Sequence, residues 1–186
     1  MIKLHTHLLD ADDALVSPEQ IAPLTPESRA TAFFSDFRQA EPRVVEGSML
    51  ATDARRLLAA AHERLRLVVN KQGEFIGLID VRHLTEQNIL RHLLADKTHR
   101  DELVVADLMT PRRQLLALSR VEAEKASIGQ VIECLQEAAQ PYCLIVDDEA
   151  HHIRGVFSLY EIARALHTPE VIRSPVSLAR AFAVAS

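Results

Sequence analysis

The sequence is poor in the side chains on which several classes of protein depend. Tryptophan is absent and aromatic residues make up only 4% of the 186 residues, which argues against a surface on which nucleic-acid bases stack. The net charge of −5 gives no basic footprint, so we expect no nucleic-acid partner. No apolar run approaches the ~20 residues of a membrane helix, and no signal peptide precedes the first charged residues. We therefore expect a cytoplasmic protein without a membrane partner.

Cysteine is also scarce. Only Cys134 and Cys143 occur, both within apolar segments, and this placement predicts buried, reduced thiols rather than a disulfide. What remains is an ordinary globular composition, 48% hydrophobic and 25% charged. A chain of this length suits one domain or two small ones.

The amino terminus offers the first candidate for chemistry. It reads MIKLHTHLLD, with His5 and His7 separated by one residue after an apolar run. This resembles the first strand of metal-dependent amidohydrolases and of histidinol-phosphatase-like phosphoesterases, in which two imidazoles reach one metal ion. A catalytic metal needs further ligands from distant positions, and the other histidines show no ligand-like pairing. We keep a metal-dependent hydrolase as a remote alternative and expect no metal site and no enzyme.

The middle of the chain predicts a helix, two strands and a second helix. Apolar residues recur at helical spacing over 54–65, and 67–69 predicts a short buried strand. A turn at 70–73 leads to a second strand over 74–79. The second helix is expected to begin around Asp80 and to run through Leu94.

The same order of elements returns in the second half. A helix is predicted over 128–139, a strand over 142–146, a second strand over 153–157 and a helix over 159–166. Val68 corresponds to Ile145 and Gly77 to Gly155, at a nearly constant offset along the chain. Two unrelated segments would rarely share this order, so we predict an internal repeat whose two copies pack together.

Short motifs of the second copy resemble a known family. The runs DLMTP at 107–111, CLIVD at 143–147 and GVFSLYEI at 155–162 are similar to the motifs of a CBS domain. The first half, with FSDF at 34–37, LVVN at 67–70 and Gly77, resembles a more diverged copy. The resemblance implies a tandem CBS pair, or Bateman module, of the α/β class (α+β type). Each copy then follows the order β-α-β-β-α, and a pseudo-twofold axis relates the two.

This resemblance divides the chain into four predicted segments. They are an N-terminal arm and helix over 1–27, a first CBS repeat with a linker helix over 28–95, a second CBS repeat over 96–170, and a C-terminal tail with a short helix over 171–186. The sequence Thr25-Pro26-Glu27 is a helix-start signature, because it combines a capping hydroxyl, a proline at the first helical position and an acid.

The resemblance also implies a ligand, often an adenosine derivative, in the cleft between the copies. In the second copy it implies that Gly155 permits close backbone approach, Ser158 contacts a phosphate and Glu161 binds ribose hydroxyls. Thr110, Cys143 and Arg154 complete this predicted site. Ser158 and Glu161 also fit a capping box, in which both side chains bond to helix-end N–H groups without any ligand.

A weaker site is predicted in the first copy, from Gly77, Asp80 and His83. Asp80 stands where the second copy has its hydroxyl, and His83 stands where it has its acid. A carboxylate at this position would repel a phosphate. We therefore expect an unphosphorylated adenosine-like ligand or an empty cleft in this half.

Together these features predict a non-catalytic regulatory protein that requires no cofactor. Its expected regulatory ligands are AMP, ADP, ATP or S-adenosylmethionine. The alternative is a ligand-free module for dimerisation or for docking to another protein. CBS pairs commonly form flat dimers through their helices, so we expect a homodimer and an unidentified protein target as partners. The matching helices here carry Leu57, Leu58, Val131 and Leu135, most of which should serve the internal core.

Overall fold

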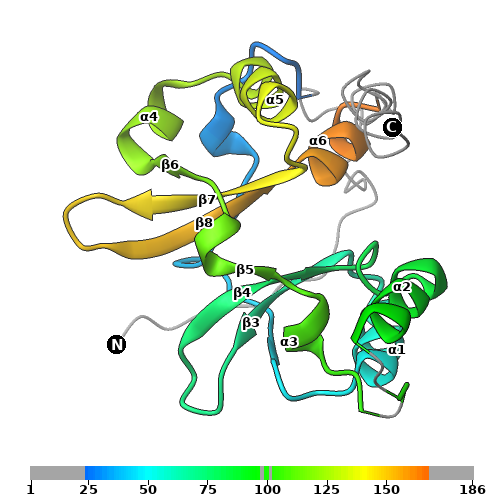
Figure 1. The fold of residues 1–186 in the computed structure, drawn as a ribbon. Helices are drawn as coiled ribbons and strands as arrows, with labels where there is room; N and C mark the ends of the chain where they lie inside the picture. The colour runs from blue at the N-terminus through cyan, green and yellow to red at the C-terminus, as the bar shows by residue number, and fades with distance from the viewer. Residues whose placement is uncertain (1–23, 97–98, 101, 168–186) are drawn as a thin grey trace, which may run out of the picture.

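The computed structural model describes residues 24–167 except 97, 98 and 101, and these residues form two units of the same design. In Figure 1 the unit built from the first half of the chain lies below the unit built from the second half. The lower unit contains β2 (Val44–Glu46), α1 (Ala51–Ala60), β3 (Leu65–Val69), β4 (Phe75–Asp80) and α2 (Glu86–Asp96). Its order is the predicted β-α-β-β-α.

The upper unit repeats this order with one additional short helix. It contains β6 (Ala117–Ser119), α4 (Arg120–Lys125), α5 (Ile128–Glu137), β7 (Tyr142–Asp147), β8 (His152–Ser158) and α6 (Leu159–Ala165). Short elements precede each unit. They are the 3-10 helix η2 (Ala30–Ala32) and β1 (Ser35–Asp36) before the lower unit, and α3 (Val105–Leu108), β5 (Thr110–Pro111) and the 3-10 helix η3 (Arg112–Gln114) before the upper one.

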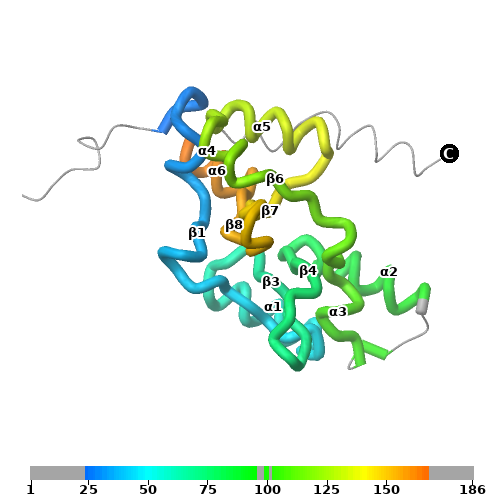
Figure 2. Tube along the Cα trace, turned by 90° about the vertical axis from the view of Figure 1, so that its left-hand side faces the viewer, coloured from blue at the N-terminus to red at the C-terminus, as the bar shows by residue number. Residues whose placement is uncertain are grey.

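Each sheet takes its fourth strand from the segment that precedes the other unit. The strand orders are β2-β3-β4-β5 and β1-β8-β7-β6, in which only the β2–β3 and β6–β7 pairs are parallel. Figure 2 shows β1 beside β8, after which the chain descends into the lower unit. The sheets therefore extend across the predicted boundary between residues 95 and 96, and the four predicted segments remain a prediction.

The strand pairing repeats in a way that confirms the pseudo-twofold relation. Ser35 pairs with Val156 and Asp36 with Gly155, just as Thr110 pairs with Leu78 and Pro111 with Gly77. The register also shifts at matching positions of β3 and β7, between Val68 and Val69 and between Ile145 and Val146. The predicted tandem architecture is therefore confirmed.

Two glycines allow the exchanged strands to approach the sheets. A Cβ atom on Gly77 would lie 2.5 Å from the carbonyl oxygen of Thr110, and a Cβ atom on Gly155 would overlap the carbonyl oxygen of Ser35. Atoms other than hydrogen do not approach so closely without a bond, so any side chain here would displace β5 or β1. In this structure a neighbouring strand lies against each of these glycines, where the resemblance implies the close approach of a ligand.

Buried apolar side chains form three groups: one core in each unit and one between the units. One lies between the upper sheet and its helices and includes Ile128, Leu135, Ile145 and Phe157, each 1% exposed. Its counterpart in the lower unit is centred on Leu58 and Ile79. A third group fills the seam between the two sheets and consists of Leu67, Leu78, Tyr142, Leu144 and Val156. Because successive strand residues point to opposite faces, each sheet is buried on both sides.

Helix α2 begins later than predicted. It starts at Glu86 rather than around Asp80, and residues 81–85 form turns. Asp80 organises this turn, because its Oδ1 atom accepts a hydrogen bond from the N–H of Arg82 at 2.7 Å. The N–H of Asp80 in turn donates to Nδ1 of His83 at 3.0 Å. Aspartate side chains compete for backbone donors in this way, and the competition delays the helix.

The helix predicted at Thr25-Pro26-Glu27 is also wrong. The N–H of Ser28 donates to the carbonyl oxygen of Thr25, which closes a single turn. A bridge to Ser127 then holds Arg29 in extended form before the short 3-10 helix η2. The prediction of two buried thiols is half right, because Cys143 is buried whereas Cys134 is exposed on α5. The segments 1–23, with His5 and His7, and 171–186 lie outside the described residues.

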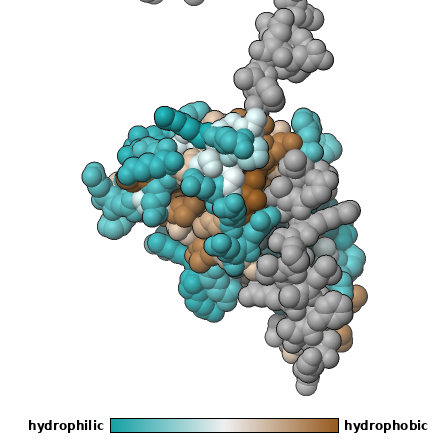
Figure 3. Space-filling view, turned by 90° about the horizontal axis from the view of Figure 1, so that it is seen from above, coloured by the Kyte–Doolittle hydropathy of each residue, from teal (hydrophilic) through white to brown (hydrophobic). Residues whose placement is uncertain are grey.

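The surface offers few apolar side chains. Seen from above, the described residues are mostly hydrophilic, with small separate hydrophobic areas between them (Figure 3). Of the residues predicted at a dimer contact, Leu58, Val131 and Leu135 are at most 1% exposed and belong to the internal cores. The homodimer itself remains a prediction. No helix within the described part of the chain is both long enough and apolar enough to cross a bilayer.

Candidate functional site

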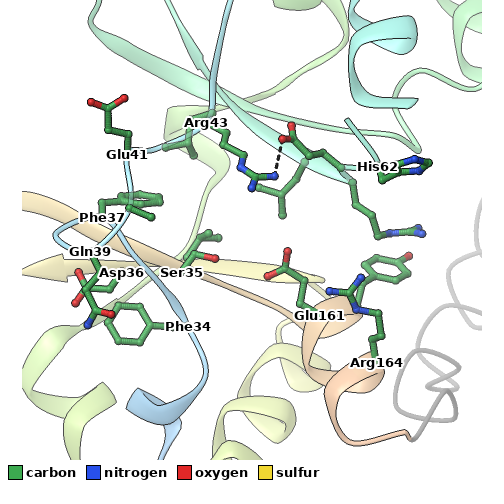
Figure 4. Close-up of a pocket in the computed structure, with 17 residues that line it drawn as sticks. Phe34, Ser35, Asp36, Phe37, Gln39, Glu41, Arg43, His62, Glu161 and Arg164 are labelled. Carbon is green, nitrogen blue, oxygen red and sulfur yellow. Dashed lines mark hydrogen bonds and ion pairs between the residues drawn. The ribbon is translucent and has the colours of Figure 1, made fainter. Parts of the chain in front are cut away.

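A pocket of about 470 Å³ lies between the two units (Figure 4). The upper unit supplies one wall, from Phe34, Ser35 and Phe37 in and around β1, Val156 of β8, and Tyr160, Glu161 and Arg164 of α6. The lower unit supplies the facing wall, from Arg43, His62, Glu63 and Arg64 and from Leu65 and Leu67 of β3. The upper wall therefore depends on the pairing of β1 with β8.

The two ends of the pocket differ in chemistry. Figure 4 shows Phe34 and Phe37 at one end and His62 and Arg164 at the other, with Glu161 pointing into the space between them. The guanidinium carbon of Arg64 lies 4.2 Å from the centre of the Tyr160 ring, which holds a second arginine near the charged end. The end with the two phenylalanines also carries Gln39 and Glu41, so an aromatic and polar end, the Glu161 carboxylate and a cationic end follow one another along the pocket.

Several charged groups of the pocket already have partners. Glu63 accepts from Arg43 at 2.5 Å and from Arg66 at 2.7 Å. Asp36 lies 3.2 Å from a guanidinium nitrogen of Arg154. Burial raises the pKa of Asp36, but hydrogen bonds from the Arg38 N–H and from Arg154 outweigh it and leave this pKa lowered. Asp36 is therefore a paired carboxylate at neutral pH and a poor candidate for ligand binding.

Four charged side chains of the pocket have no charged partner in the described part of the chain: Glu41, Arg64, Glu161 and Arg164. Among the described residues, no hydrogen bond or ion pair joins the Glu161 carboxylate or the Arg164 guanidinium to another side chain. Arg64 meets only the face of Tyr160, which does not use its N–H donors. The carboxylates can accept hydrogen bonds from hydroxyls, and the guanidinium groups can donate hydrogen bonds to an anion.

The structure separates the residues predicted for the second-copy site. Glu161 lines the pocket. Ser158 is 2% exposed at the start of α6, and its Oγ atom has no hydrogen-bond partner among the described residues. Its side chain makes no cap hydrogen bond, so the capping box that Ser158 and Glu161 could form is not present.

The other members of that predicted group have structural surroundings. Gly155 faces Ser35 of β1, and Arg154 binds Asp36 and lies near Asp147. Cys143 packs in the core of the upper unit, where burial raises the pKa of its thiol to about 12. Thr110 does not line the pocket and lies beside His83 and Tyr142.

The first-copy residues form a closed polar cluster around Thr110. Its Oγ1 atom lies 3.3 Å from Nε2 of His83 and 3.1 Å from the hydroxyl oxygen of Tyr142. His83 also accepts from the N–H of Asp80, and Nε of Arg82 donates to Asp80 at 2.9 Å. These direct contacts leave no space for a ligand between Thr110, His83 and Tyr142. Gly77 lies against β5 at the edge of this cluster.

Burial sets the charge of two members of this cluster. It lowers the pKa of His83, which Arg82 and His92 lower further while Asp80 opposes them. Burial also raises the pKa of Tyr142. Both groups are therefore neutral near pH 7, and a neutral His83 is what the hydrogen bond from the Asp80 N–H to its Nδ1 requires.

The described residues show no metal-binding cluster. No group of three or more histidine, cysteine, aspartate or glutamate side chains within this part of the chain is arranged to hold an ion. The hypothesis of a metal-dependent hydrolase rests on His5 and His7, which lie outside the described residues.

Comparison with known proteins identifies the architecture. Residues 35–89 match the family model of the CBS domain, and this is the copy that we predicted to be the more diverged. A CBS domain protein of Thermoplasma acidophilum, TA0289, superposes with a TM-score of 0.54 at 18% identity, over 80% of this chain and 78% of that one. The fold is that of a CBS-domain pair. None of the curated proteins matches the sequence.

Two further CBS structures carry ligands. CBSX2, in complex with AMP, superposes with a TM-score of 0.51 at 22% identity, over 74% of this chain and 95% of that one. The CBS pair of protein MJ0100, in complex with 5′-methylthioadenosine and S-adenosyl-L-methionine, does so with a TM-score of 0.51 at 15% identity, over 75% and 95%. At these identities the likeness concerns the fold of the CBS pair.

Sequence reasoning missed most of the residues that line the pocket. Phe34 and Phe37 precede the strands of the first repeat in sequence, and only the crossing of β1 to β8 brings them to Glu161. Arg164 could have been found, because it lies one helical turn after Glu161 on the same face. For Arg64 the sequence offers no comparable signal.

Proposed function

We propose that this CBS pair is a non-catalytic regulatory module that binds an adenosine-type ligand in the pocket between its two units. The observation that carries the proposal is the unpaired Glu161 carboxylate, between an aromatic end and a cationic end of one pocket. A nucleoside has a flat base for the aromatic end, hydroxyls for the carboxylate and a 5′ substituent for the cationic end. The AMP and S-adenosylmethionine complexes of other CBS pairs support the same ligand class.

Binding assays on the whole chain test this proposal. We expect AMP, ADP, ATP or S-adenosylmethionine to raise the melting temperature, because a ligand that binds only the folded state stabilises it. Glu161→Gln should weaken binding, since an amide is a poorer acceptor for ribose hydroxyls. Glu133→Gln is a matched control, because Glu133 is an exposed acid of α5 that does not line the pocket. If no adenosine compound produces a response, the proposal is wrong.

A ligand-free docking module is the second candidate. The exposed side chains of Leu90 and Leu94, one turn apart on α2 and 53% and 81% exposed, favour it. Under this alternative adenosine compounds leave the melting temperature unchanged. Leu94→Ser would then reduce self-association or partner binding, measured by sedimentation velocity, while Glu161→Gln would have no effect.

A further inference from the structure

The two clefts of the pair carry different charged side chains at corresponding positions of the two copies. By the offset that relates Gly77 to Gly155, Arg164 corresponds to Glu86 and Glu161 to His83, and the strand alignment of Val68 with Ile145 places Arg64 opposite Pro141. Glu86 is engaged on the outside by Arg55 and Arg100. In the described residues of the first copy, the remaining cation near its cluster is Arg82, which is paired with Asp80.

The first-copy cleft is closed by its own side chains. Tyr142 occupies the position that Leu65 occupies in the pocket, and its hydroxyl reaches Thr110 at 3.1 Å. Asp80 is 1% exposed and carries a buried carboxylate where the second copy has Ser158. A phosphate in this cleft would have to displace these hydrogen bonds. It would also approach the carboxylate of Asp80, and two negative charges repel each other strongly where they are buried away from water.

The open pocket, unlike the first-copy cleft, contains arginines that are not paired with a carboxylate. Its arginines Arg64 and Arg164 have no carboxylate partner among the described residues, and Arg43 is already paired with Glu63. Glu161 accepts hydrogen bonds from hydroxyls but repels an anion, so an anionic group is placed away from it. The cationic end, where Arg64 lies over the Tyr160 ring, is the position where such a group is stabilised.

We infer, on the basis of the proposed function, that the chain binds one nucleotide, in the open pocket, with its phosphate facing Arg64 and Arg164. The pocket therefore selects a 5′-phosphate over a 5′-hydroxyl or a cationic 5′ substituent. The first-copy cleft takes no ligand, so one nucleotide binds per chain.

Isothermal titration calorimetry of the full chain with AMP, adenosine and S-adenosylmethionine tests the inference. We expect one AMP per chain and an AMP affinity at least about tenfold above that of adenosine, as hydrogen bonds between charged groups provide. S-adenosylmethionine should bind more weakly than AMP, because its sulfonium is a cation. Raising NaCl should reduce the advantage of AMP over adenosine.

Two variants locate the effect. Arg164→Gln should lower AMP affinity while leaving adenosine affinity unchanged. Arg56→Gln is the matched control, because Arg56 is an exposed arginine of α1 that pairs with Asp53 and does not line the pocket. It should change neither affinity.

The outcomes separate the inference from the proposed function. If adenosine binds as tightly as AMP, if two nucleotides bind per chain, or if Arg164→Gln weakens both ligands equally, the inference is overturned while adenosine binding stands. If none of the three compounds binds, both are overturned.

Discussion

Gly155→Ala should weaken both the fold and the pocket, whereas Gly77→Ala should weaken the fold alone. The added methyl at Gly155 overlaps the Ser35 carbonyl oxygen and would lie 2.6 and 2.8 Å from two ring carbons of Phe34. Since Phe34 and Ser35 form part of the pocket wall, any movement that relieves the overlap moves that wall. At Gly77 the methyl meets Thr110 and the sulfur of Met109, at 2.5 and 2.7 Å, and neither residue lines the pocket.

The magnitude follows from the type of contact. Overpacking costs about 1–3 kcal/mol in the free energy of unfolding. A backbone oxygen cannot rotate away as a side chain can, so the strand itself must shift, and β1 and β5 are both very short strands with little pairing to resist the shift. We therefore expect both variants to lose stability within this range, by about 1–3 kcal/mol.

Urea denaturation followed by circular dichroism measures the stability, and calorimetry with AMP measures the pocket. Gly155→Ala should reduce AMP affinity several-fold, and Gly77→Ala should retain it. The reasoning is refuted if both variants lose affinity to the same extent, or if neither loses stability.

Buried groups allow three further tests. Because the folded protein keeps His83 neutral and its pKa below the usual 6.5, its contribution to stability is present above pH 6.5 and is lost as pH falls below it. Urea midpoints measured between pH 7.5 and 5 should fall accordingly, and His83→Asn should flatten the change. An equally steep fall in the variant would contradict the role of His83. A thiol reagent at pH 8 should modify Cys134 alone in the native protein and Cys143 only after unfolding, and equal native rates would contradict the burial of Cys143. Phe157→Ala should cost about 3–5 kcal/mol in a denaturant titration, since its ring is 1% exposed, and a loss below about 1 kcal/mol would contradict its core position.

The repeat was predictable because both copies keep the same local signals. Alternating and helical spacing of apolar residues placed β3, β4, α5, β7 and β8 to within a few residues of the observed ends. The start of α2 was not predictable, because Asp80 is a good helix cap in isolation. In the structure its carboxylate accepts hydrogen bonds from the N–H and the Nε of Arg82 within a turn instead. The helix at Thr25 failed for a related reason, since pairing with Ser127 outweighs local propensity.

The candidate site was predictable only in part. The motif ending at Glu161 located one residue of the pocket, and its replacement by Asp80 and His83 in the first copy anticipated that the two halves would differ. Thr110 was assigned beside Ser158, but β5 pairs with β4, which carries Thr110 to the first-copy cluster. A residue's position in the linear order of a repeat does not reveal which sheet it joins.

The sequence by itself determined the two copies, their internal order of elements and their asymmetry in charge, because these depend on side-chain chemistry and on spacing along one strand or helix. Only the tertiary structure decided which cleft is open. Crossing of β1 and β5 between the sheets brings Phe34 into the pocket that Glu161 lines and sets Thr110 against Tyr142. Such contacts join residues that lie far apart in the chain, so no local pattern encodes them.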